Sequence, residues 1–131
     1  MKFDRAKTGK VIADIRRYSD DLSELKFGDK SMSKLEFYSS SMLIFSIVNS
    51  YMDLANELIS SNHLGYPATY ADMFDILFDK KIINKKENDA FKRLINVRNA
   101  IAHRYFNITL SDVHNAMSDL KKVNSFLSLF N

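Results

Sequence analysis

The stretch SMSKLEFYSSSMLIFSIVNSYMDLANELISSNH, residues 31–63, decides the fold. Apolar residues recur along it at intervals of three and four, which places them on one face of an α-helix. Apolar residues crowd both sides of its middle, MLIFSIV at 42–48, so we expect this long helix to lie between neighbouring helices. The residues that we assign to its inner face are Leu35, Tyr38, Met42, Phe45, Met52, Ala55 and Ile59.

Helical spacing on either side of this stretch predicts four more helices, three long and one short. Gly28 can end the first of them, and Gly65 with Pro67 separates the central helix from the short one. We therefore expect an all-α bundle of four main helices and one short helix, in a single domain over residues 1–131. The predicted ranges are 8–26, 31–63, 70–81, 85–104 and 110–129.

Polar residues mark the starts of three predicted helices. The pairs Thr69–Asp72 and Asn84–Glu87 have the spacing of a capping box, in which two side chains three residues apart bond each other's backbone N–H groups. The last predicted helix has two candidate caps, Thr109 and Ser111.

The composition excludes several classes of protein. With 131 residues, 46% of them hydrophobic, the chain is long enough for one domain with a buried core. It has no cysteine, which excludes a disulfide framework and a thiolate metal site. The start, MKFDRAKTGK, lacks the apolar stretch of a secretory signal, and no apolar run approaches the roughly 20 residues of a membrane span. We therefore expect a soluble cytoplasmic protein.

The net charge of +3 is unevenly placed. Eight basic and two acidic residues lie between Lys80 and Tyr105, a net charge of +6, whereas the rest of the chain has a net charge of −3. A local positive field of this kind favours binding of a polyanion. A solvated helix face explains such a run of charge as well.

The string RNAIAHRY, residues 98–105, ends the fourth predicted helix and carries the chemistry. Arg98 and His103 supply what metal-free RNA cleavage needs, because a guanidinium holds a phosphate and an imidazole, with an unperturbed pKa of about 6.5, moves protons near neutral pH. Asn99 and His103 share a helix face, but His103 lies about 140° around the helix from Arg98. Either the long Arg98 side chain reaches across, or two copies of the helix meet at a two-fold axis and share the site.

In such a site His103 would take the proton from the ribose 2′-OH, and Arg98 would stabilise the charge on the phosphorane with Asn99 in support. The neighbouring cations extend the expected RNA-binding surface. We find no Gly-rich phosphate loop and no histidine pair with metal-ligand spacing, and we therefore expect no cofactor and no metal site. The residues expected to bind RNA are Lys92, Arg93 and Arg104.

Structural interpretations compete with this one. An Arg and a His at this spacing arise often by chance, and the two can simply pair with a carboxylate and a helix end. Asp53 can orient Arg98 or His103, although we favour an ordinary surface acid or a structural partner for an arginine. Tyr66 and Tyr70 can stack on bases, although we favour packing for both.

Three segments, SYMDLANELIS (50–60), HLGYPATYADMFDILFDKKII (63–83) and FKRLINVRNAIAHRYFNIT (91–109), resemble HepT-type proteins of the HEPN superfamily in order and spacing. The pattern Arg-x4-His resembles the superfamily signature, and the tyrosine two residues after the histidine resembles the HepT branch. The likeness covers about residues 32–125. It implies an all-α homodimer in which the motifs face each other across the interface.

The resemblance also implies a function. HepT-type proteins are the toxins of toxin–antitoxin pairs: metal-independent endoribonucleases that are neutralised by an MNT-type nucleotidyltransferase, which transfers AMP from ATP to the motif tyrosine. Carried over, Arg98 and His103 are catalytic, Asn99 is supportive and Tyr105 is the modified residue. Two alternatives stay open. One is a catalytically inactive helical subunit that serves as docking partner or substrate of a nucleotidyltransferase, and the other is a structural helical dimer with no role in nucleic-acid binding.

Overall fold

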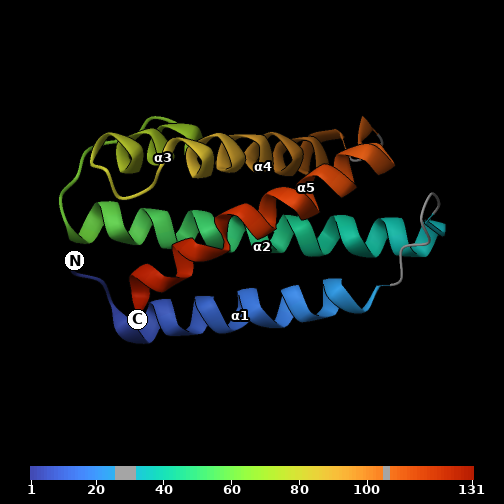
Figure 1. Cartoon of the computed structure of the whole chain (residues 1–131), viewed down its shortest axis with the longest axis horizontal. Coiled ribbons are helices and arrows are strands. Elements are labelled where there is room, and N and C mark those ends of the chain that lie inside the picture. The colour runs from blue at the N-terminus through green and yellow to red at the C-terminus, as the bar shows by residue number, and fades with distance from the viewer. Residues whose placement is uncertain (26–31, 105–106) are drawn as a thin grey trace.

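A computed structural model describes residues 1–25, 32–104 and 107–131, and all regular structure within these ranges is helical (Figure 1). The expected all-α architecture of four main helices and one short helix is confirmed there. None of the helices in these ranges combines the length and the apolar character needed to cross a membrane. The bounds are α1 Arg5–Glu24, α2 Lys34–Ser61, α3 Tyr70–Asp79, α4 Lys85–Arg104, α5 Leu110–Val123 and the 3₁₀ helix η2 Asn124–Phe130.

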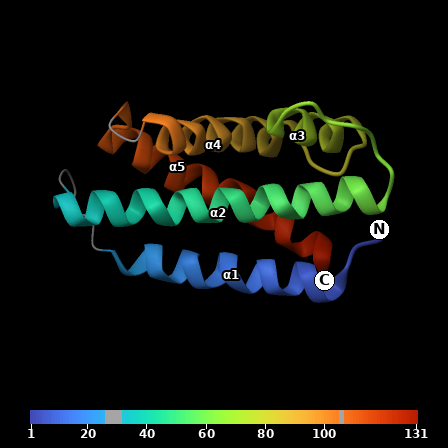
Figure 2. The same cartoon turned by 180° about the vertical axis from the view of Figure 1, so that it is seen from behind.

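The long helix α2 lies at the centre of the bundle, as its sequence predicts. α1 packs along one side of it, and α3 and α4 pack along another (Figure 1). α5 crosses α2 obliquely, in front of it in Figure 1 and behind it in Figure 2, and η2 reaches α1. Since α4 runs antiparallel to α2, the C-terminal part of α4 lies beside the N-terminal half of α2.

Reciprocal side-chain caps start four of the helices. In each pair, the side-chain oxygen of the first residue accepts from the backbone N–H of the acid three residues later. The carboxylate of that acid accepts from the backbone N–H of the first residue, so two otherwise unpaired N–H groups are satisfied. Asp4 caps α1 by accepting from the backbone of Lys7 at 3.0 Å, which starts this helix earlier than predicted. Gly28, the predicted stop, lies outside the described residues. The four pairs are Ser33–Glu36, Thr69–Asp72, Asn84–Glu87 and Thr109–Asp112.

The predicted last helix, 110–129, changes its winding at Asn124. In a 3₁₀ helix, residues three apart lie above one another. Val123 and Phe126 form one such pair and Leu127 and Phe130 another, and all four are buried. With three residues per turn, the two pairs form two columns about 120° apart, and both columns face the core.

An aromatic cluster joins the helices in the core. The rings of Phe74 and Phe91 stack with centroids 4.2 Å apart, and Tyr51 and Phe126 each meet Phe91 edge-on, at 5.5 Å and 5.3 Å. These residues belong to α3, α4, α2 and η2. Edge-to-face and stacked pairs stabilise a core by about 0.5–1.5 kcal/mol beyond the burial of their area, so this cluster fixes α4 against α2 and α3.

The predicted inner face of α2 is correct from Phe45 onward, where Phe45 is half-buried against the core, and wrong before it. Met52, Ala55 and Ile59 are buried. Leu35, Tyr38 and Met42 instead are 76%, 48% and 57% exposed. Spacing identifies an apolar face without identifying what covers it, and here α1 and α4 cover a different face of the N-terminal half of α2. The residues buried there are Ser40, Ser41, Ile44, Ile47 and Val48.

Candidate active site

Arg98 is anchored by the central helix. Its Nε donates to Oδ1 of Asn49 on α2 at 2.8 Å, and its Nη1 donates to Oδ1 of the adjacent Asn99 at 3.0 Å. Both acceptors are neutral amides, and no carboxylate among the described residues pairs with Arg98. The guanidinium is therefore oriented without losing its positive charge to a partner.

Two aromatic rings flank the same guanidinium. Its central carbon lies 5.2 Å from the ring centre of Phe45 and 5.4 Å from that of Tyr70, within the range of cation–π attraction. A guanidinium carries five N–H donors, and the two amides use one on Nε and one on Nη1. The remaining donors lie on Nη1 and Nη2, which form the edge that suits a two-pronged bond to a phosphate.

Arg98, Asn99 and His103 line one cleft within a single chain. The cleft has a volume of about 810 Å³, and the loop before α3 forms its opposite wall with Tyr70. His103 is exposed and Arg98 is half-buried. Arg98 and His103 therefore line the same cleft although they lie about 140° apart around α4.

The structure places Lys92 and Arg93 in ion pairs between helices. Lys92 Nζ lies 2.6 Å from Oδ1 of Asp75 on α3, and this contact is the main cause that lowers the pKa of Asp75. Arg93 donates through Nε and Nη2 to both oxygens of the buried Asp119 on α5, at 3.0 Å and 2.9 Å, which raises the pKa of Arg93. Both cations thus stabilise the packing of α4, and their contact with RNA stays a prediction.

The structure locates one of the other two predicted site residues. Arg104 is the last residue of α4. Tyr105 lies outside the described residues, so its role as the modified tyrosine stays a prediction.

Sequence reasoning missed Asn49 and considered Asp53 instead. Asp53 lines a neighbouring hollow with Asn49 and Arg98, and burial raises the pKa of its carboxyl. The residue that bonds Arg98 is Asn49, one helical turn before Asp53. A signal for it exists, because Asn49 lies four residues before Asp53 on the same helix face, so the reasoning that singled out Asp53 applies to Asn49 as well.

We predicted from the sequence that Tyr66 and Tyr70 pack against the protein. This prediction is wrong for Tyr66, whose side chain is fully exposed. Tyr70 is 48% exposed and contacts Arg98 through its ring. The loop that leads to Tyr70 turns at Gly65, whose φ of 155° suits glycine.

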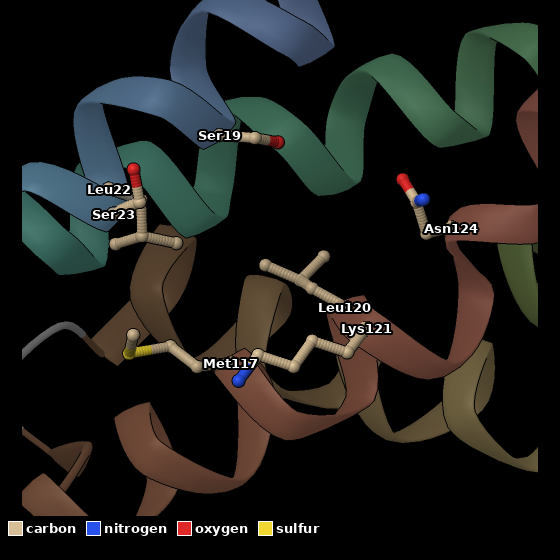
Figure 3. Close-up of a pocket in the computed structure, with 7 residues that line it drawn as sticks. All are labelled: Ser19, Leu22, Ser23, Met117, Leu120, Lys121 and Asn124. Atoms are coloured by element: carbon tan, nitrogen blue, oxygen red, sulfur yellow. The ribbon is translucent and has the colours of Figure 1, made fainter.

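A second hollow, of about 290 Å³, lies between α1 and α5 (Figure 3). Its lining contains no histidine or acid, so it offers no pair of groups for acid–base catalysis. Three His, Cys, Asp or Glu side chains do not converge anywhere in the described part of the chain. The lining residues are Ser19, Leu22, Ser23, Met117, Leu120, Lys121 and Asn124.

Residues 9–129 match the sequence model of the family described as "Ribonuclease HepT-like". A relative named "mRNA nuclease HepT", from Shewanella oneidensis, is 25% identical over 122 residues, which cover 90% of this chain and 91% of the relative. YutE of Bacillus subtilis is 32% identical over 59 residues, which cover 45% of this chain and only 41% of YutE.

Solved structures share the fold. A tri-AMPylated HEPN toxin of Shewanella oneidensis, in complex with an MNT antitoxin, superposes with a TM-score of 0.83 at 23% identity, over 93% of this chain and 94% of that chain. YutE, described as a cytosolic protein of unknown function, superposes with a TM-score of 0.75 at 22% identity, over 98% of this chain and 85% of that chain.

Proposed function

Because the chain belongs to the HepT-like ribonuclease family, we propose that it is a metal-independent endoribonuclease that acts as the toxin of a toxin–antitoxin pair. The observation that carries the proposal is the shared cleft, which holds a phosphate-binding group with an unneutralised charge, Arg98, beside an exposed proton carrier, His103. The hollow between α1 and α5 has a cation, Lys121, but no histidine in its lining.

The reaction follows from the two groups. The free edge of the Arg98 guanidinium binds the scissile phosphate and stabilises the charge that grows on its oxygens. His103 takes the proton of the ribose 2′-OH as that oxygen attacks phosphorus, and the bond to the 5′-oxygen breaks as this leaving group takes a proton from a histidine or from water. The products carry a 2′,3′-cyclic phosphate and a 5′-hydroxyl. DNA has no 2′-OH and is spared.

The chain acts as a homodimer in this proposal. The exposed row Leu35, Tyr38 and Met42 on α2 supports it, because three large apolar side chains on one helix face mark a contact surface. The row continues into Phe45, which contacts Arg98. A two-fold axis near this row would bring two copies of the cleft together.

The proposed antitoxin is an MNT-type nucleotidyltransferase that transfers AMP from ATP to Tyr105. The reason is electrostatic. Tyr105 follows His103 by two residues, and each added phosphate brings negative charge to the place where the RNA backbone binds, so the modified toxin repels its substrate. Arg104 adds to the positive surface that attracts RNA, and Lys92 and Arg93 contribute to it less because Asp75 and Asp119 pair with them.

The decisive experiment incubates the unmodified protein with total RNA in EDTA, with Arg98→Ala and His103→Ala variants alongside. We expect cleavage by the wild type alone, with 2′,3′-cyclic phosphate ends. If the wild type, shown by intact mass to carry no AMP, leaves the RNA whole, the nuclease proposal fails. The chain is then assigned the role of docking or substrate subunit of a nucleotidyltransferase.

A further inference from the structure

The cleft that holds Arg98 and His103 extends beyond them over a neutral surface. Asn96 and Asn56 line this part, from α4 and α2, and Tyr70 lines it from the start of α3. Its volume of about 810 Å³ lies in the range of roughly 300–1,000 Å³ that is typical of small-molecule sites. It is therefore larger than the binding of a single phosphate requires.

The described lining of the cleft offers no second cation for a further phosphate. Arg98 is the only described side chain with a permanent charge in this cleft, and no acid lines it. A further phosphate group would need a further cation. The rest of the cleft suits a group that is neutral, flat and rich in hydrogen-bonding atoms.

The amides supply the hydrogen bonds. Asn56 and Asn96 are exposed, and neither side chain has a hydrogen-bond partner in the described part of the chain. An asparagine amide offers two N–H donors and one carbonyl acceptor. This set matches the edge of a nucleobase, and asparagine is a common bidentate partner of adenine.

Tyr70 supplies a stacking surface. Its ring is 48% exposed and lies 5.4 Å from the central carbon of Arg98. Single-stranded RNA is recognised by bases that stack on aromatic rings while their edges bond to polar side chains. Pro67 and Ala71 on the same wall are small, so they leave room beside the ring.

We propose that this part of the cleft is a nucleobase subsite. It takes the base of a nucleotide next to the scissile phosphate, which stacks on Tyr70 and bonds through its edge to Asn96 and Asn56. Cleavage is then selective for the base at one position beside the cut. The inference rests on the proposed ribonuclease function and adds the substrate feature that this function leaves open.

The first test is cleavage of a randomised RNA pool, followed by sequencing of the ends. We expect a base bias at one position beside the cut in the wild type. Asn96→Ala should reduce the bias about tenfold, since one bidentate contact discriminates bases by roughly that factor or more. Tyr70→Ala should raise KM about tenfold, and Tyr70→Phe should restore it. Asn115→Ala, at an exposed amide on α5, is the matched control. A wild type without bias, or a bias unchanged in Asn96→Ala and Tyr70→Ala, overturns the subsite.

The second test separates the subsite from the nuclease. Short RNA probes with one central base, A, C, G or U, and 2′-O-methyl groups that prevent cleavage are titrated into the wild type and the Asn96→Ala variant. We expect the wild type to bind one base at least fivefold more tightly, and the variant to lose this preference. Base-selective binding without cleavage of unmodified RNA supports the subsite and contradicts the nuclease. Cleavage of unmodified RNA combined with equal affinity for all four probes supports the nuclease and contradicts the subsite.

Discussion

Asn49 Oδ1 accepts a hydrogen bond from Arg98 Nε at 2.8 Å, across the interface between α2 and α4. The two residues are far apart in the sequence, and the bond fixes which edge of the guanidinium faces the cleft. Because the acceptor is an amide, it orients the cation without neutralising it. Asn49 is thus a positioning residue in the proposed mechanism.

Two substitutions at this position separate orientation from charge. Asn49→Ala removes a hydrogen bond to a charged group, which contributes about 1.5–3 kcal/mol, so we expect RNA cleavage to fall by roughly 10- to 100-fold. Asn49→Asp keeps the acceptor but adds a negative charge beside Arg98, and we expect it to raise KM more than Asn49→Ala does. Steady-state kinetics on a defined RNA will check both.

The control for this series is Asn115→Ala, which changes an exposed amide away from the cleft. An Asn49→Asp enzyme with the KM of the wild type would show that the charge of Arg98 does not need a neutral acceptor.

The exposed row on α2 predicts the assembly of the protein. Met42, 57% exposed, is the last residue of this row and lies between Tyr38 and Phe45. Met42→Glu would bury a charge in the proposed dimer interface, so we expect sedimentation to give the 15.2 kDa mass of one chain for the variant and twice that mass for the wild type. A wild type that sediments as a single chain contradicts the homodimer.

Glu57 makes stability depend on acid pH. Its carboxylate accepts from Ser61 Oγ, from the backbone N–H of Asp4 at 3.1 Å and from Lys7 Nζ at 3.4 Å, and these bonds, led by that of Ser61, lower its pKa. The ionised form therefore stabilises the fold above the unfolded pKa of about 4.3, and this contribution disappears as the pH falls through the lowered folded pKa.

We expect Glu57→Ala to lower the free energy of unfolding at pH 7 by about 1–3 kcal/mol, because it removes the hydrogen bonds that three donors make to this buried carboxylate. The difference from the wild type should shrink on acidification below about pH 4. Urea denaturation at several pH values will measure it, with Glu24→Gln, at an exposed acid on α1, as the control. A difference that does not change with pH would rule out the carboxylate as its source.

Two glycines predict stability changes of opposite sign. Gly65 has a φ of 155°, and a Cβ there would lie 3.2 Å from Cδ1 of Ile76. Gly65→Ala should therefore destabilise the fold by roughly 1–2 kcal/mol. Gly9 lies within α1 with nothing within 4 Å of an added Cβ, so Gly9→Ala should stabilise it by about 0.5–1 kcal/mol. Thermal unfolding of the two variants will show the signs, and equal shifts would contradict the argument.

Local chemistry explains which parts of the fold can be predicted. The caps Asn84–Glu87 and Thr69–Asp72 act within one turn, and they set the starts of α4 and α3 where the sequence predicts them. The exposure of Leu35 and the change of winding at Asn124 depend on which neighbour packs there, and spacing along one helix does not contain that information.

The same distinction holds for the candidate site. Arg98, Asn99 and His103 are close in sequence, and the cleft does contain all three. Asn49 and the ring of Tyr70 reach Arg98 from other helices, so only the tertiary structure reveals them. Arg93 was predicted from its charge alone, and its partner Asp119 lies 26 residues away on α5.

The hydrogen bonds and ion pairs that join α4 to three other helices bear on how the proposed site can be inhibited. Lys92 joins α4 to α3, Arg93 to α5 and Arg98 to α2, and the aromatic cluster is packed beneath. Because contacts to three helices hold α4, we expect this wall of the cleft to keep its shape while the bundle stays folded. An inhibitor would then act by blocking the cleft rather than by distorting it, and removal of the blocking group would restore activity.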